Sequence, residues 1–277
     1  MVEVILGGEA VAAGVVTRHL LRTSYRPVYR GVYAANGGEL TLRDRAIAAW
    51  LATRRKGVIA GVAASGLHGA SWVDAAQPIE VAGVKCAPQQ GLLPRTERIA
   101  DDEVTLVAGL PVTTLARTAF DVARHLDRPC ALARLDAMMW AQPFSLDDVR
   151  ELAKRYPRAP GSRQMRDLLP LVDGGAAAPG QSRIRLALLD AGFPRPQTQV
   201  AVLVGAQPVA YLDIAWPEHR VAVEYGPKDV ARQRMLEALG WSVIRVAADD
   251  RPEDWLAAVE SALASRGCFV EANYLAA

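Results

Sequence analysis

Two acidic residues in the last third of the chain, Asp213 and Glu224, have the type and spacing of ligands for a divalent cation. Each lies in an apolar segment, 209–216 or 220–225, that the sequence predicts to be a strand. Neighbouring strands could bring both carboxylates to one edge of a sheet, where they would bind Mg²⁺. Such a metal activates water and stabilises charge on a phosphate undergoing cleavage. An acid at a strand end can equally be simply solvated, so the pair alone does not establish a site.

The segments around these acids predict an α/β module with a central mixed sheet over residues 181–277. Their pattern gives helix, three strands, helix, strand and helix, in that order. The expected elements are a helix at 182–191, strands at 200–204, 209–216 and 220–225, a helix at 230–239, a strand at 241–246 and a helix at 252–265. The run DGGAAAPG at 173–180 precedes the module and is small and flexible, as expected for a linker.

A different chemistry is indicated at the N-terminus, where basic residues are concentrated. Residues 1–60 hold nine Lys and Arg against four Asp and Glu, although the whole chain has a net charge of only +2. The pattern predicts a helix at 8–13, a turn at Gly14, a second helix at 17–23 and a hairpin at 25–35. This order is typical of a winged helix-turn-helix. A small structural helical domain with a basic soluble face would give the same pattern.

In a winged helix-turn-helix, the second helix enters the major groove of duplex DNA and the hairpin follows the backbone. The candidate DNA-binding residues are Arg18, His19 and Arg22 on the second helix and Arg26 and Arg30 on the hairpin. An arginine can donate two hydrogen bonds to one guanine, whereas the hairpin arginines would contact phosphates. Double-stranded DNA is therefore the expected partner.

The segment between the two ends is predicted to be mostly helical, with short strands only at 58–60 and 78–81. The expected fold class is α+β. It comprises a winged helix-turn-helix at 1–40, a mainly helical domain at 41–173 and the α/β domain at 181–277.

Composition excludes several classes of protein. No apolar run reaches the roughly 18 residues that span a bilayer, and no signal-peptide pattern is present, so a cytoplasmic location without membrane contact is expected. The three cysteines, Cys86, Cys130 and Cys268, are far apart, and the four histidines are scattered. This spacing favours neither a disulfide framework nor a zinc site.

Three segments resemble a known family in their order along the chain. They are YRGVY at 29–33, IAGVAASGLHG at 59–69 and LPVTTLARTAFD at 110–121. Together they are similar to the type IV antitoxins of the abortive-infection system, the AbiEi-like family. The resemblance implies a DNA-binding autorepressor that counters a partner toxin of the nucleotidyltransferase-like kind.

The polar residues of these segments are interpreted as structural. Arg117 and Asp121 are four residues apart on one helix face, which predicts a local ion pair. His68 is interpreted as a hydrogen-bonded histidine at a helix end. DNA contacts are left to the N-terminal module.

A second resemblance covers about residues 181–265. The segments YLDIAWP at 211–217, RVAVEY at 220–225 and LGWSVIRV at 239–246 resemble small bacterial domains related to the very-short-patch-repair endonucleases. The resemblance implies a restriction-endonuclease-like fold with a metal site of the PD-(D/E)xK type, in which Asp213 and Glu224 would be catalytic and would bind the metal.

The chain departs from that family at several positions of the site. Gln181 replaces the family's first acid, and an amide cannot supply the negative charge that holds a divalent cation. After Tyr225 the family's Asp and its histidine-bearing loop are missing. Lys228 could stand in for a catalytic lysine, although its place fits an arginine of the family's next helix better. We therefore expect an incomplete site that requires no cofactor, with Mg²⁺ bound only if the site is active.

Three functions remain open. The first is an antitoxin-like transcriptional autoregulator with a degenerate nuclease-fold domain. The second is a Mg²⁺-dependent DNA endonuclease that its N-terminal DNA reader targets. The third is a protein-interaction module that neutralises a toxin without DNA. The basic residues favour the first two, and Gln181 with the shortened loop favours the first over the second. The sequence leaves the oligomeric state open.

Overall fold

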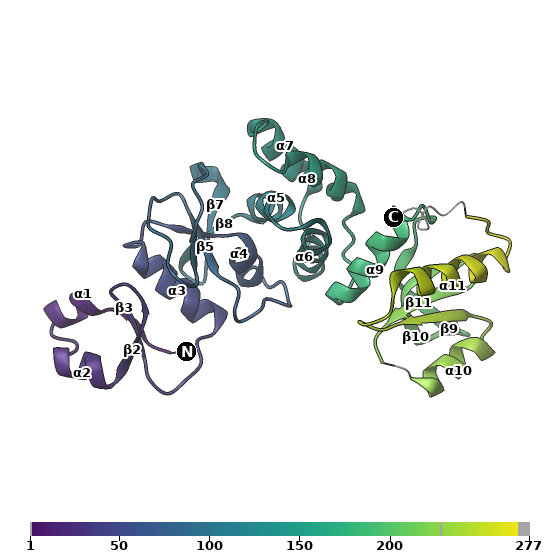
Figure 1. Ribbon diagram of the computed structural model, residues 1–277, viewed down its shortest axis with the longest axis horizontal. Coiled ribbons are helices and arrows are strands. Elements are labelled where there is room, and N and C mark those ends of the chain that lie inside the picture. The colour runs from purple at the N-terminus through teal and green to yellow at the C-terminus, as the bar shows by residue number, and fades with distance from the viewer. Residues whose placement is uncertain (1, 228, 271–277) are drawn as a thin grey trace. The chain divides into compact units, whose positions relative to one another are not determined.

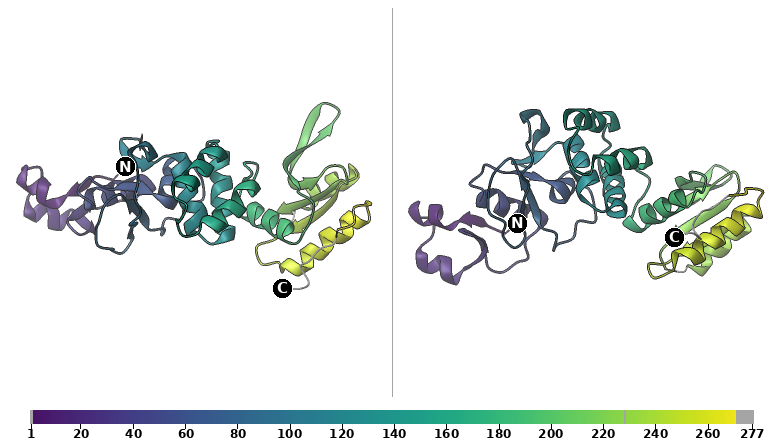
Figure 2. Two further views of the ribbon diagram at one scale, coloured as in Figure 1. Left: turned by 90° about the horizontal axis from the view of Figure 1, so that it is seen from above. Right: turned by 45° about the horizontal axis from the view of Figure 1, so that its top comes forward.

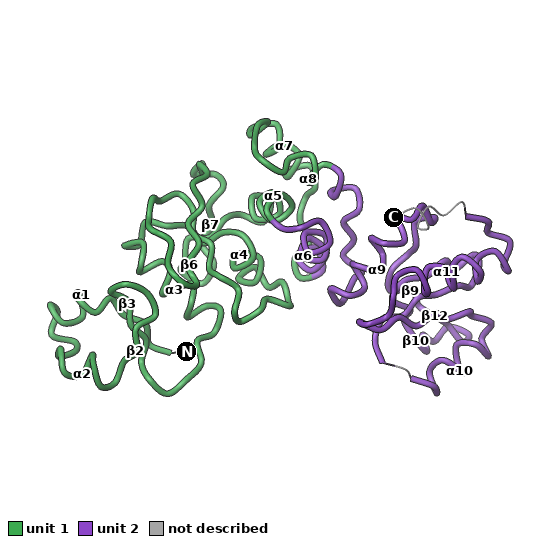
Figure 3. The backbone as a smooth tube through the Cα atoms, viewed as in Figure 1, with its two compact units in different colours: residues 1–125, 141–166 green, residues 126–140, 167–277 purple. Residues whose placement is uncertain are grey.

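The computed structural model describes residues 2–227 and 229–270 and divides into two compact units (Figures 1 and 3). Unit 1 contains Met1–His125 and Ala141–Arg166, and unit 2 contains Leu126–Trp140 and Asp167–Ala277. Helices and sheets occur in both, so the fold class is α+β. These two units differ from the three domains expected at 1–40, 41–173 and 181–277, and that division stays a prediction.

Unit 1 begins with a small antiparallel sheet and two short helices. These elements are β1 (Val4–Leu6), α1 (Gly7–Ala12), α2 (Arg18–Thr23), β2 (Tyr25–Tyr29) and β3 (Val32–Ala35). The strand order is β1-β3-β2. The Thr17 hydroxyl caps α2 by accepting the Leu20 N–H at 3.1 Å, and Gly31 closes the hairpin with a φ of 78°. The expected helices and hairpin are present, and β1 is an additional strand.

The next part of unit 1 contains a five-stranded mixed sheet, with strand order β6-β5-β4-β8-β7. Its elements are α3 (Leu42–Ala52), β4 (Val58–Ala60), α4 (Gly61–Leu67), β5 (Ile79–Ala82), β6 (Leu92–Pro94), β7 (Val104–Val107) and β8 (Leu110–Thr113). Helices still form most of the regular structure over 41–173, as expected, and the predicted strands at 58–60 and 78–81 correspond to β4 and β5, whereas β6, β7 and β8 were not predicted. These three strands have only three or four residues each, which is too short a run for the alternation of a half-buried strand to be recognised.

The two sheets of unit 1 share one hydrophobic core, with α3 between them (Figure 1). Leu6 and Val32 of the first sheet and Ile59 and Val112 of the second belong to the same cluster of buried side chains. Alanines on α3, among them Ala46 and Ala49, let both sheets approach that helix closely. The N-terminal elements are thus attached to the rest of unit 1 by buried apolar surface.

Three further helices complete unit 1. They are α5 (Leu115–His125), α7 (Leu146–Arg155) and α8 (Ser162–Leu168), of which the last two residues lie in unit 2. Helix α5 packs against both α4 and α7. Eight consecutive residues of α5, from Arg117 to Arg124, are buried, so polar side chains of this helix must find partners inside the protein.

Unit 2 contains a four-stranded mixed sheet, with strand order β12-β11-β10-β9. Its elements are α6 (Arg128–Ala141), α9 (Pro179–Asp190), β9 (Gln197–Val204), β10 (Gln207–Trp216), β11 (Val221–Tyr225), α10 (Val230–Ala238), β12 (Ser242–Val246) and α11 (Pro252–Ala264). Strands β9, β10 and β11 are antiparallel neighbours, and β12 runs parallel to β11. The elements from α9 onward follow the predicted order. The β9–β10 hairpin projects beyond the rest of the sheet (Figure 2).

Helix α6 joins α9 through a buried ion pair. The Arg185 guanidinium on α9 donates to the Asp136 carboxylate on α6 at 2.7 Å, and both side chains are at most 1% exposed. Burial raises the pKa of Asp136, against the opposing effect of Arg185. Asp136 also accepts the backbone N–H of Asp173, at the start of the predicted linker 173–180. That segment lies within unit 2.

Candidate functional site

The expected recognition helix, α2, presents its polar side chains to solvent. No residue of α2 is buried, and Arg18, His19 and Arg22 are all exposed. Within residues 2–227 and 229–270, the side chains of these three residues make no hydrogen bond or salt bridge. They are therefore available to an external ligand.

A close contact at Gly7 positions α2. A Cβ atom at Gly7 would lie 2.7 Å from the Tyr33 ring and 2.9 Å from the Leu21 side chain, so only glycine allows α2 and β3 to approach the start of α1. Helix α2 also contacts β2. The structure thus places α2 directly beside the hairpin.

The two hairpin arginines have different environments. The half-buried Arg26 guanidinium donates to the carbonyl oxygen of Gly38 and closes the loop after β3. Arg30 lies exposed at the tip, and its backbone N–H donates to Gln89 Oε1 at 2.7 Å. The Tyr29 hydroxyl donates to the Gly91 carbonyl at 2.8 Å, which fastens the hairpin to the loop before β6. Arg30 can therefore reach a ligand, whereas Arg26 is engaged within the protein.

In unit 2, the structure brings the two predicted acids together. Ile214 pairs with Val223 in the antiparallel ladder, so Asp213 on β10 and Glu224 on β11 are the next neighbours across the strands. Asp213 accepts the backbone N–H of Tyr225 at 2.9 Å. Burial is the largest cause that raises the pKa of Asp213, and the nearby Glu224 charge also raises it.

Both carboxylate oxygens of Glu224 are bound by arginines. Arg232, on α10, donates to Oε1 at 2.7 Å, and Arg245, on β12, donates to Oε2 at 2.5 Å. Glu224 is buried, so these guanidiniums neutralise it inside the protein. The two guanidinium groups thus bind the same carboxylate oxygens that would have to coordinate a metal ion.

The other two predicted members of this site add no acid. The side-chain oxygen of Gln181 accepts the backbone N–H of Ala177 at 2.7 Å, and its side chain also hydrogen-bonds Asp213. Lys228 lies outside the described residues. Among the residues that the structure describes, no group of three or more His, Cys, Asp or Glu could share a metal ion. An amide, a half-buried Asp and an arginine-bound Glu do not fit Mg²⁺, which requires several oxygen ligands.

The polar residues of the 110–121 segment form a buried network. Arg117 Nε donates to Asp121 at 2.8 Å, which confirms the predicted ion pair, and Arg117 also binds Glu103. Arg124 donates to Asp121 at 2.7 Å. Arg155 donates to Glu103 at 2.8 Å. Sequence reasoning missed Glu103, Arg124 and Arg155 as members, because no local spacing relates Arg155 to a residue 52 positions earlier.

His68 also has the structural role that was predicted for it. It is the C-cap residue of α4, and its Nε2 lies 2.7 Å from the carbonyl oxygen of Thr113. The histidine therefore joins the end of α4 to the end of β8.

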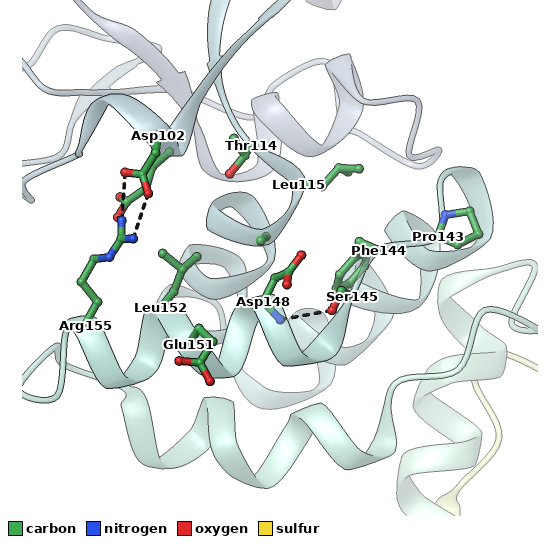
Figure 4. Close-up of a pocket in the computed structure, with 12 residues that line it drawn as sticks. Asp102, Thr114, Leu115, Pro143, Phe144, Ser145, Asp148, Glu151, Leu152 and Arg155 are labelled. Atoms are coloured by element: carbon green, nitrogen blue, oxygen red, sulfur yellow. Dashed lines mark hydrogen bonds and ion pairs between the residues drawn. The ribbon is translucent and has the colours of Figure 1, made fainter.

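A pocket of about 570 Å³ lies beside the network (Figure 4). Its charged lining residues are Asp102, Glu103, Asp148, Glu151 and Arg155. Figure 4 shows Arg155 reaching Asp102, and Ser145 capping α7 by accepting the Asp148 N–H at 3.2 Å. Four carboxylates against one guanidinium would repel phosphate, so this pocket is not a nucleic-acid site.

The described residues contain no helix long and apolar enough to cross a membrane.

Two comparisons relate the chain to known proteins. Residues 49–171 match the family described as AbiEi antitoxin C-terminal domain, which includes the segments 59–69 and 110–121 and confirms the first resemblance there. Two relatives from Mycobacterium tuberculosis are each 30% identical over 238 residues, covering 80% of this chain and 85% of the relative. They are "Uncharacterized protein Rv2248" of strain H37Rv and "Uncharacterized protein MT2308" of strain CDC 1551.

Proposed function

This chain belongs to the protein family of these two mycobacterial relatives and carries an AbiEi antitoxin domain at 49–171, and from that premise we propose that it is a DNA-binding, antitoxin-like autoregulator. One observation carries the proposal. The basic side chains of α2, Arg18, His19 and Arg22, are exposed and have no partner within the described residues. A solvated helix of this kind after a tight turn and beside a hairpin fits the major groove of duplex DNA.

The proposed contacts divide by their chemistry. Arg18 and Arg22 are one turn apart on α2 and would reach base edges or flanking phosphates. Arg30 at the hairpin tip would contact the phosphate backbone. The partner toxin, of the nucleotidyltransferase-like kind, is proposed from the antitoxin domain, and the operator would lie upstream of the gene for this chain.

We further propose that unit 2 has a restriction-endonuclease-like fold without cleavage activity and without a cofactor. The strand order and the adjacent acids support the fold. Two observations support the loss of activity. Position 181 holds an amide instead of an acid, and two arginines bind the oxygens of Glu224, so neither position offers a free carboxylate to Mg²⁺. Unit 2 would then add contacts or stability to the regulator.

A gel-shift titration of the full chain on the DNA upstream of its gene tests these proposals, at two salt concentrations and with Mg²⁺. We expect a shift that resists competitor DNA and leaves the duplex intact. The double variant Arg18→Ala/Arg22→Ala should weaken binding and flatten its salt dependence, since fewer counterions are released. Arg163→Ala, an exposed arginine on α8, is the matched control.

Each contrary result has a separate meaning. No shift at low salt would overturn DNA binding and favour a protein partner. Unchanged binding by the double variant would overturn the assignment to α2. Loss of the duplex with Mg²⁺ would revive the endonuclease, provided that Asp213→Asn abolishes it, whereas cleavage by that variant would indicate a contaminant.

A further inference from the structure

A second basic surface lies at the C-terminal end of α3. Arg54, Arg55 and Lys56 are consecutive and all exposed. The Arg54 N–H donates to the Leu51 carbonyl at 2.9 Å, and the Arg55 N–H donates to the Trp50 carbonyl at 2.9 Å. These two bonds are the pair that defines a Schellman motif, in which the helix ends on a left-handed residue. We refer to residues 54–56 as the basic turn.

The residues of the basic turn are unusual for its backbone. Arg54 and Arg55 have φ values of 55° and 61°, in the left-handed region where glycine is favoured. A side chain with a Cβ costs free energy at such a position. Glycine at position 54 would make the fold more stable than arginine does. The left-handed backbone at Arg54 therefore points to a use of this side chain outside the fold.

Contacts of the basic turn attach it to α1. Arg55 donates twice to the Glu9 carboxylate, at 3.0 and 2.6 Å. The hydrogen bond from Arg55 is the largest cause that lowers the pKa of Glu9, and the charge of Arg54 acts in the same direction. Arg55 thus neutralises the acid of α1. Within residues 2–227 and 229–270, the side chains of Arg54 and Lys56 make no hydrogen bond or salt bridge, so two positive charges remain.

We propose that the basic turn binds the phosphate backbone of duplex DNA beside the groove that α2 enters. This inference rests on the proposed DNA-binding function. In a helix-turn-helix the first helix crosses the DNA backbone while the second enters the groove. The basic turn is fastened to that first helix, α1, through Glu9, and it supplies Arg54 and Lys56 to the phosphates there.

The test measures binding of the full chain to its upstream DNA over a range of salt concentrations. Each lost phosphate contact lowers the slope of log K against log salt by about 0.9, so Arg54→Ala/Lys56→Ala should lower it by roughly 1.8. Binding at low salt should weaken roughly tenfold. Arg163→Ala removes one charge from another exposed surface and should leave the slope unchanged.

Two further variants separate binding from folding. Arg54→Gly and Arg54→Ala both remove the charge and should weaken binding equally. Glycine accepts the left-handed backbone without strain, so Arg54→Gly should unfold about 2–4 °C above Arg54→Ala. Glu9→Gln removes an acid beside the phosphates, while its amide oxygen can still accept a hydrogen bond from Arg55 and keep the basic turn on α1, so it should strengthen binding.

The outcomes distinguish this inference from the function on which it rests. If the wild-type chain binds and Arg18→Ala/Arg22→Ala weakens binding, while the 54/56 double variant binds like wild type, the basic turn does not contact DNA. An unchanged affinity in Glu9→Gln would contradict the inference in the same way. If the wild-type chain shows no binding at low salt, the proposed function itself is overturned.

Discussion

Helices α2 and α5 use the same side chain in opposite ways. Arg18 and Arg22 on α2 are exposed and have no partner within the described part of the chain. Arg117 and Arg124 on α5 are 2% and 6% exposed, and carboxylates bind both of them. A buried guanidinium is tolerated only with such partners, whereas an exposed one remains available to an anion. The arginine of the family-like segment is thus structural, and the candidate DNA-binding arginines of α2, Arg18 and Arg22, lie outside the matched residues 49–171.

The largest effect that this comparison predicts is a loss of stability in Arg117→Ala. Asp121 and Glu103 would keep buried charges with fewer partners, so the free energy of unfolding should fall by about 3–5 kcal/mol. Urea unfolding of the full chain measures the loss. Arg150→Ala, which breaks an exposed ion pair on α7, should cost less than about 1 kcal/mol. If Arg117→Ala lost as little stability as Arg150→Ala, the contrast between the two helices would disappear.

A smaller effect should appear in acid at the edge of the same network. The hydrogen bond from His125 lowers the pKa of Glu97 from 4.5 to about 2. A lowered carboxyl pKa stabilises the fold above the unfolded pKa, and this contribution disappears as the pH falls from about 4.5 to about 2. Wild type should therefore lose at most about 3 kcal/mol over that range, and Glu97→Gln should lack this part of the loss. Parallel acid-unfolding profiles in the two proteins would contradict the assignment.

The contribution of Asp213 to the pH dependence of stability should have the opposite sign to that of Glu97. Burial raises its pKa, so the charged form penalises folding above the folded pKa, and the penalty disappears below the unfolded pKa. Asp213→Asn keeps an oxygen that can accept the Tyr225 N–H and removes the charge. We expect a small gain in unfolding free energy at neutral pH and none near pH 3. A loss at neutral pH would mean that the charged carboxylate stabilises the fold.

The smallest effect concerns the exposed arginines. Arg18→Ala/Arg22→Ala should change the free energy of unfolding by less than about 0.5 kcal/mol, because α2 contributes no buried residue to the core. The same urea titration that follows Arg117→Ala measures this difference. A large loss would show that these side chains hold the fold, and it would weaken their assignment to DNA.

The sequence predicted unit 2 better than unit 1 for a physical reason. Strands β10 and β11 have ten and five residues, and the turns before them contain Gly205 and Pro217, so local pattern identifies them. Strand β6 has three residues, and β8 contains Pro111, which is unfavourable in a strand pattern. Such strands form because neighbours distant in sequence complete their hydrogen bonding.

The candidate sites were predictable to a similar extent. The strand pattern placed Asp213 and Glu224 on adjacent strands, because register follows from alternation. It could not show that Arg232 and Arg245 would bind Glu224, since both come from elements that follow it in the chain. The basic turn likewise depends on a contact between Glu9 and Arg55 that no local spacing indicates.

The division of the chain also constrains the order in which its parts can fold during synthesis. Unit 1 has all its residues once the ribosome has passed 166, whereas α6, made earlier, belongs to unit 2. Asp136 on α6 has to wait for Arg185 before its buried charge is compensated. Because N-terminal parts generally fold first as a protein emerges, α6 is left without its partner until α9 has been made. If the gene were divided at 173–180, Asp136 and Arg185 would be encoded on different fragments, so recombination there would not exchange intact modules.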